Sequence, residues 1–88
     1  APNDTVTREQ AAVLLYRLAN HLGMDTSARA NLSSYTDAAQ VSAYAQEAMQ
    51  WAVASGLLNG RTATTLAPQG SATRAEGAKI LSSFTALT

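Results

Sequence analysis

The sequence contains no cysteine among its 88 residues. Disulfide bonds, thiolate nucleophiles and cysteine-based zinc sites are therefore excluded. It has a single histidine, His21, which falls near the end of a predicted helix and lacks a second histidine or a close pair of carboxylates to share a proton or a metal ion. We therefore predict no catalytic constellation, no metal site and no cofactor, so the protein is not expected to be an enzyme.

Charged residues are also scarce. Only 14% of the residues are charged and the formal net charge is zero, so the chain has no basic face for nucleic acid or for an acidic membrane surface. The longest stretch without a charge, residues 48–60, is shorter than the roughly 20 apolar residues that cross a bilayer. We expect neither nucleic acid binding nor membrane insertion. No basic and apolar run follows Ala1, so we expect a piece of a longer mature protein rather than a signal peptide.

The chain does contain an internal repeat, with an offset of 66 residues that places position 67 on position 1. Six residues recur identically at this offset. Ala1, Pro2, Thr7, Arg8, Ala12 and Leu15 return as Ala67, Pro68, Thr73, Arg74, Ala78 and Leu81. Self-similarity at a fixed spacing indicates that one supersecondary unit is used twice.

Each copy of the repeat predicts an amphipathic helix, over residues 7–22 and 73–86. Each helix starts with a threonine followed three residues later by Gln10 or Glu76, which is the pattern of a reciprocal capping box. Apolar residues then follow at spacings of three and four. These are Ala11, Leu14, Leu15, Leu18 and Leu22 in the first helix, and Gly77, Ile80, Leu81 and Phe84 in the second.

A third, shorter helix is predicted over residues 45–53, with its start near Ser42 and its end at Gly56. Residues 23–36 and 57–72 are polar and aperiodic and read as long, ordered surface loops. The predicted fold is all-α: a small helical bundle in which two long helices pack together beside one shorter helix.

The order of six landmarks resembles the S-layer homology (SLH) repeat of bacterial surface proteins. The landmarks are Tyr35-Thr36-Asp37, Tyr44-Ala45, residues 48–54, Gly56-Leu57-Leu58-Asn59-Gly60, Leu66-Ala67-Pro68 and Thr73-Arg74-Ala75-Glu76. On this resemblance, residues 35–88 form a complete SLH-like repeat, residues 1–22 the closing half of a preceding one and residues 23–34 a connecting loop. The chain departs from the family pattern where Tyr44 replaces a tryptophan and Leu66 an aromatic residue, and where the first box reads Thr7-Arg8-Glu9-Gln10.

The resemblance implies a non-catalytic module, located outside the cell at its wall or surface. SLH modules hold secondary cell-wall polysaccharide, often pyruvylated, in grooves between repeats, and they belong to larger exported proteins. Three repeats usually form a spindle with a central bundle of long helices. Because this chain has only two of these helices, a second copy of the chain or a neighbouring SLH repeat is the further expected partner.

Arg8 and Arg74 occupy the first position of their helices, where the positive end of the helix dipole disfavours a cation. One interpretation is that each guanidinium and the free amides of the first turn bind the carboxylate of a pyruvylated sugar. The other is that each arginine pairs with a carboxylate such as Asp37 or Asp4 and clamps a loop. Asp37 itself either orients Arg74, accepts a hydrogen bond from a sugar hydroxyl, or only caps a helix or forms a turn.

Trp51 and Tyr44 lie seven residues apart in and before the predicted third helix. Either they form an aromatic strip that stacks on a sugar, or both pack on a neighbouring loop. The predicted ligand-binding residues are Arg74, Asp37, Gly60, Ser71, Trp51 and Arg8. The alternative function is a protein interaction or oligomerisation module that uses the apolar faces of the long helices. A helix-turn-helix DNA binder is disfavoured, because a long loop joins the later helices and neither has a basic face.

Overall fold

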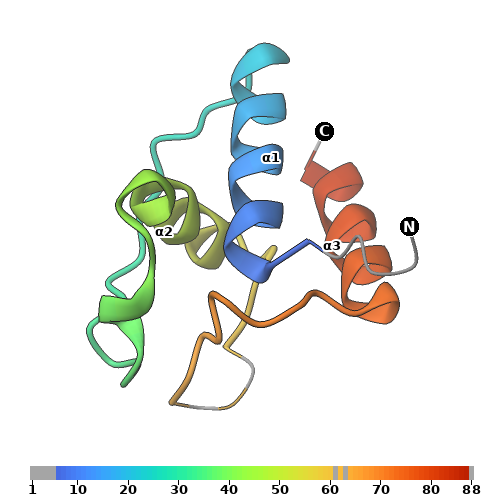
Figure 1. Cartoon of the computed structure of the whole chain (residues 1–88). Helices are drawn as coiled ribbons and strands as arrows, with labels where there is room; N and C mark the ends of the chain where they lie inside the picture. Colours follow the sequence, from blue (N-terminus) through green and yellow to red (C-terminus); the bar gives the residue numbers. More distant parts are fainter. Residues whose placement is uncertain (1–5, 61, 63, 88) are drawn as a thin grey trace.

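The computed structural model describes residues 6–60, 62 and 64–87 of the chain. These residues form three α-helices, as predicted: α1 (Arg8–His21), α2 (Gln46–Ala54) and α3 (Arg74–Leu87) (Figure 1). Two short 3-10 turns precede α2, η1 (Ala38–Gln40) and η2 (Ala43–Ala45), and neither was predicted. The all-α fold class is confirmed. The repeat landmarks Ala1 and Pro2, and the proposed ion-pair partner Asp4, lie outside the described residues.

Both capping boxes are present. The Thr7 hydroxyl accepts from the Gln10 amide at 3.1 Å, and the Thr7 amide donates to the Gln10 side chain at 2.9 Å. The same two bonds join Thr73 and Glu76 at 3.0 and 2.9 Å. Each box satisfies two amides that a helix N-terminus would otherwise leave without a partner. The sequence therefore located both starts to within one residue.

The main helix pair is α1 with α2, which lie side by side in Figure 1. On α1 the contact face contains the small residues Ala12 and Ala19 together with Leu15, all buried. The small side chains let the large Trp51 and Met49 of α2 come close, and both are almost fully buried. Leu57, Leu58 and Leu66 close the same core from the loop after α2. The core is thus built mainly on α1, α2 and the loop between α2 and α3, and it is completed by Leu32, Val41 and residues of α3.

The predicted apolar face of α1 is wrong in part. Leu14 is 58% exposed, and Leu18 and Leu22 are also exposed, whereas the buried residues of this helix follow the line Arg8, Ala12, Leu15 and Ala19. The predicted face was the one with the largest apolar side chains. The buried face is instead the one that contains two alanines, because small side chains allow close packing of the helices. An apolar stripe therefore remains on the surface of α1.

The predicted packing of α1 against α3 is also wrong. Helix α3 reaches the core through Ile80 and Phe84, while Leu81, predicted to be buried, is 58% exposed. The two long helices make few direct contacts, and an apolar groove of about 510 Å³ runs between them with Leu14, Ile80 and Leu81 among its walls. The α1–α3 relationship is therefore set by polar contacts at their N-termini.

Candidate functional site

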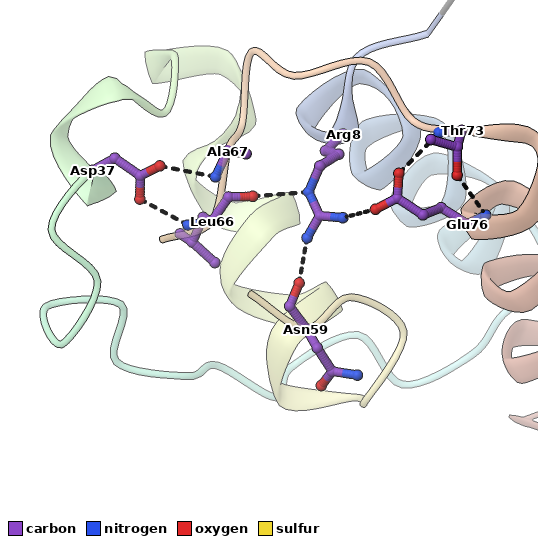
Figure 2. Close-up of polar contacts among 7 residues, drawn as sticks. All are labelled: Arg8, Asp37, Asn59, Leu66, Ala67, Thr73 and Glu76. Carbon is purple, nitrogen blue, oxygen red and sulfur yellow. Dashed lines mark hydrogen bonds and ion pairs between the residues drawn. The ribbon is translucent and has the colours of Figure 1, made fainter. Parts of the chain in front are cut away.

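The Arg8 guanidinium lies buried at the start of α1 and is bound through all three of its nitrogens (Figure 2). Its Nε donates to the Leu66 carbonyl at 2.8 Å, and its Nη1 forms an ion pair with Glu76 Oε2 at 2.5 Å. Its Nη2 donates to the Asn59 carbonyl. One side chain thus joins α1 to two points of the loop between α2 and α3, and to α3 itself. The clamp interpretation holds for Arg8, with Glu76 as the carboxylate in place of Asp37 or Asp4.

The backbone amides at the start of α1 are also occupied. The Arg8 amide donates to the Gly70 carbonyl at 2.9 Å and the Glu9 amide to the Pro68 carbonyl at 3.1 Å, while the Gln10 amide is held by the capping box. The segment of residues 68–71 therefore covers this helix terminus, with a β-bridge between Ser71 and Thr7. Because no donor of the first turn is open, the predicted anion site at Arg8 is corrected to a structural joint.

Asp37 is a loop anchor. Its two carboxylate oxygens accept from the amides of Leu66 and Ala67, each at 2.8 Å (Figure 2). The bond from the Leu66 amide is the main reason that the pKa of Asp37 lies below its ordinary value, while partial burial opposes the shift and the Ala67 amide and the charge of Arg8 reinforce it. Ala67 has a φ of 49°, which a residue with a side chain rarely adopts. Asp37 thus holds the strained turn that leads into the segment covering α1.

Gly60 is required by packing rather than by backbone conformation. A Cβ at this position would lie 2.6 Å from Cε1 of Tyr35 and 2.8 Å from the carbonyl oxygen of Thr65, both far inside van der Waals contact. Trp51 is 1% exposed and its ring meets Tyr16 edge to face, with 5.5 Å between the centroids. No face of Trp51 is open to a sugar, so the predicted stacking role of this residue is corrected to core packing.

Arg74 differs from its repeat equivalent Arg8. It is exposed at the start of α3, on the wall of the groove between α1 and α3. Within residues 6–60, 62 and 64–87 it has no hydrogen-bond or ion-pair partner. The Glu76 amide is held by the Thr73 hydroxyl, so this amide, expected to help bind an anion, is occupied. Among the described residues, no partner occurs for the guanidinium or for the amides of Arg74 and Ala75.

Comparison with known proteins decides the family. The family model of the S-layer homology domain matches residues 34–78, just over half of the chain. The chain belongs to the S-layer homology family. SLH domains are non-catalytic modules that anchor proteins to the cell surface, so this chain is a cell-surface anchoring module. Its division at residues 22 and 34 stays a prediction.

Curated relatives of this SLH chain are long enzymes. It is 34% identical over 84 residues to an endoglucanase of Bacillus sp. (strain KSM-635). The matched region covers 96% of this chain and 9% of the enzyme. It is 32% identical over 80 residues to the exoglucanase XynX of Acetivibrio thermocellus and 31% identical over 80 residues to an amylopullulanase of Thermoanaerobacterium thermosulfurigenes. Each match covers 91% of the chain, but only 7% and 4% of those two enzymes. No solved structure gives a significant match.

The sequence analysis missed one buried carboxylate of this SLH chain, Glu9. It accepts from the Ser42 amide at 3.0 Å and hydroxyl at 2.6 Å, and from Tyr44 and Gln69 at 3.1 Å each. Burial alone would raise the pKa of Glu9, but these four bonds, led by those from Ser42, outweigh it and hold the pKa below its ordinary value. The available signal was the first capping box, where Glu9 stands in place of the alanine of the second copy.

No cluster of three or more histidine or acidic side chains that would hold a metal ion occurs in the part of the SLH chain that the structure describes. None of the helices found there combines the length and the apolar character needed to cross a membrane.

Proposed function

We propose that this SLH module binds secondary cell-wall polysaccharide and that Arg74 receives a carboxylate of the glycan, such as a pyruvate ketal. The observation that carries the proposal is the contrast between two equivalent arginines. Arg8 is buried with all three nitrogens bonded, whereas Arg74 is exposed and has no partner among the residues that the structure describes. Of the two equivalent arginines, Arg8 therefore has no donor left for a ligand, whereas Arg74 can still bind one.

The position of Arg74 favours an anion. A cation at the first position of a helix is disfavoured by the dipole, and a bound carboxylate would reverse this effect and accept a forked pair of hydrogen bonds. The Ala75 amide, at the second position of α3, is available for the same ligand. Among the residues that line the groove between α1 and α3, Arg74 supplies the charge and the others are apolar or neutral. A carboxylate at its rim would therefore meet no competing acidic side chain there.

We further propose that the module anchors a larger enzyme. The relatives named above are an endoglucanase, an exoglucanase and an amylopullulanase, and this chain spans less than a tenth of each. A domain of this size holds a polymer more strongly when several copies act together, since tethering makes the later binding events intramolecular. The activity and the substrate of the whole protein would be those of its other domains.

The test is binding of the chain to isolated cell walls before and after mild acid hydrolysis, which removes pyruvate ketals. Arg74→Ala should abolish the difference between the two wall preparations, and Arg74→Lys should restore little of it, because an ammonium group cannot form the fork. Lys79→Ala, on the same helix, is the matched control for loss of one positive charge. Equal binding of both preparations by the unaltered chain would overturn the pyruvate proposal.

A second candidate function rests on the Arg8–Glu76 ion pair, which joins the capping boxes of successive repeats. By the same geometry Arg74 would meet the capping-box glutamate of a further SLH repeat, whose long helix would then fill the groove lined by Leu14 and Leu81. A second copy of this chain is a poorer fit, because its own Glu76 is already paired with Arg8. Adding a third repeat to the chain would bury Leu81 and raise the stability in an Arg74-dependent way if this candidate is right.

A further inference from the structure

Tyr44 presents an aromatic ring to solvent although its hydroxyl is fixed. The side chain is 61% exposed. Its hydroxyl donates to Glu9 Oε2 at 3.1 Å, and burial of the hydroxyl together with this bond and the charge of Glu9 raises the pKa of Tyr44 above its ordinary value. Ser42 and Gln69 hold Glu9 in turn. The exposed ring is therefore held in place by its hydroxyl. A ligand that binds to the ring would cost little side-chain conformational entropy, because Tyr44 is already ordered.

Two hollows flank this ring. One lies between α1 and α2, has a volume of about 330 Å³, and is lined by Tyr16, Arg17, Asn20 and Glu47 as well as Tyr44. The other, also about 330 Å³, lies over the N-terminal half of α1 and shares Tyr44 and Arg17 with the first. Tyr44 thus forms a wall common to both.

Two polar groups that line the first hollow, the Tyr16 hydroxyl and the Asn20 amide, are held by neighbouring side chains. Arg29 donates to the Tyr16 hydroxyl at 2.8 Å, and its guanidinium carbon lies 5.5 Å from the centroid of that ring. The Tyr16 hydroxyl in turn lies 3.4 Å from Glu47 Oε2. The Asn20 side-chain oxygen accepts from Thr26 at 2.6 Å, which leaves its amide group to donate elsewhere. The hollow therefore combines an open aromatic face with placed donors and an acceptor.

We infer that Tyr44 and the hollow between α1 and α2 form a saccharide subsite, in which a neutral hexopyranose unit stacks on the Tyr44 ring and bonds to Arg17, Asn20 and Glu47. A pyranose has an apolar C–H face and a rim of hydroxyls, and it matches a ring face bordered by polar groups. An apolar peptide does not match, because the charged and amide groups of Arg17, Asn20 and Glu47 would lose their water without gaining partners.

The second hollow connects this subsite to the proposed anion site. It shares Val6 and Leu14 with the groove that Arg74 borders. The surface from Glu47 past Tyr44 and Leu14 to Arg74 is therefore one series of adjoining depressions across α1. This inference rests on the proposed function, since it places further sugar units of the same wall glycan on Tyr44 while the charged unit lies at Arg74.

The experiment uses the full chain and a β-linked trisaccharide of hexopyranose units, prepared with and without a 4,6-pyruvate ketal on its terminal unit. Affinity is measured by calorimetry, and the position of the sugar by saturation-transfer NMR. Tyr44→Ala should weaken binding of both trisaccharides by about tenfold. Tyr44→Phe should keep most of the affinity, because it retains the ring. Leu22→Ala, which removes an exposed apolar side chain of 54% exposure at the end of α1, is the matched control.

The outcomes separate the two proposals. Upfield shifts of the sugar C–H signals that disappear in Tyr44→Ala support the subsite. Unchanged affinity in Tyr44→Ala overturns it, even if Arg74→Ala still abolishes preference for the ketal. Tyr44-dependent binding of both trisaccharides with no preference for the ketal overturns the pyruvate proposal and leaves the subsite standing. If the unaltered chain binds neither trisaccharide, or prefers an apolar peptide at Tyr44, the subsite is wrong.

Discussion

Arg8 of the first repeat copy and Glu76 of the second form an ion pair, with 2.5 Å between Nη1 and Oε2. The two residues come from successive capping boxes, and Glu76 uses its other oxygen to cap its own helix through the Thr73 amide. The pair therefore sets the start of α3 against the start of α1, although the two helices do not pack along their lengths. The ion pair and the backbone bonds from residues 68–72 to the start of α1 together hold the two helix starts in place.

The first prediction concerns this pair. Replacing Arg8→Ala should lower the free energy of unfolding by about 3 to 5 kcal/mol, because it leaves Glu76 and two carbonyls without their buried donor. Urea denaturation followed by circular dichroism measures this loss. Arg74→Ala is the matched control and should cost less than about 0.5 kcal/mol, since Arg74 is exposed. Similar losses for the two variants would contradict the different roles assigned to the arginines.

A second prediction separates the two leucines that the repeat makes equivalent. Leu15→Ala should cost about 2 to 5 kcal/mol, since Leu15 is buried in the core. Leu81→Ala should change the stability by less than about 0.5 kcal/mol in the chain alone, because Leu81 faces the open groove. The same urea titration measures both. A large loss for Leu81→Ala, together with self-association in sedimentation, would mean that a second copy covers the groove.

The third prediction is a pH dependence caused by Glu9. Its folded-state pKa lies below its ordinary value of 4.5, so the carboxylate stabilises the fold fully above that pH. The stabilisation is lost as the pH falls through the folded-state pKa and protons bind. We expect unfolding titrations to show a stability that declines below about pH 4.5, with Asp37 contributing in the same direction because its pKa is also lowered.

Glu9→Gln tests whether Glu9 causes this pH dependence, through the slope of stability against pH. The variant should be less stable at every pH, because its amide group would face the Ser42 and Gln69 donors that now bond to a carboxylate. Its stability should nevertheless fall less steeply below pH 4.5 than that of the unaltered chain. An unchanged slope would show that Glu9 does not titrate differently in the folded and unfolded states.

The sequence predicted what depends on local chemistry. Both long helices start at their capping threonines, and Gly56, with a φ of 77°, follows the end of α2. The sequence could not predict which face of α1 is buried, because Leu14 and Leu15 are equally apolar. That outcome depends on how Trp51 of α2 packs against the alanines of α1. Nor could the sequence predict the partner of Arg8, since no local pattern relates residue 8 to residue 76. For the candidate site, the ligand-binding roles of Arg74 and Asp37 stay predictions, whereas Glu9 and its bond from Tyr44 depend on contacts distant in the chain.

The last prediction compares two glycines of the second repeat. Gly60→Ala should cost about 1 to 3 kcal/mol, because the added methyl group would overlap Tyr35 and the Thr65 carbonyl, and backbone cannot move away as a flexible side chain can. Gly77, inside α3, is the matched control, since a Cβ there has nothing within 4 Å. Gly77→Ala should raise the stability by roughly 0.5 to 1 kcal/mol, because alanine loses less backbone freedom in a helix. Stability changes of opposite sign for the same added methyl group would show that Gly60 is needed because Tyr35 packs closely against the turn. An unchanged stability in Gly60→Ala would mean that this loop relaxes freely.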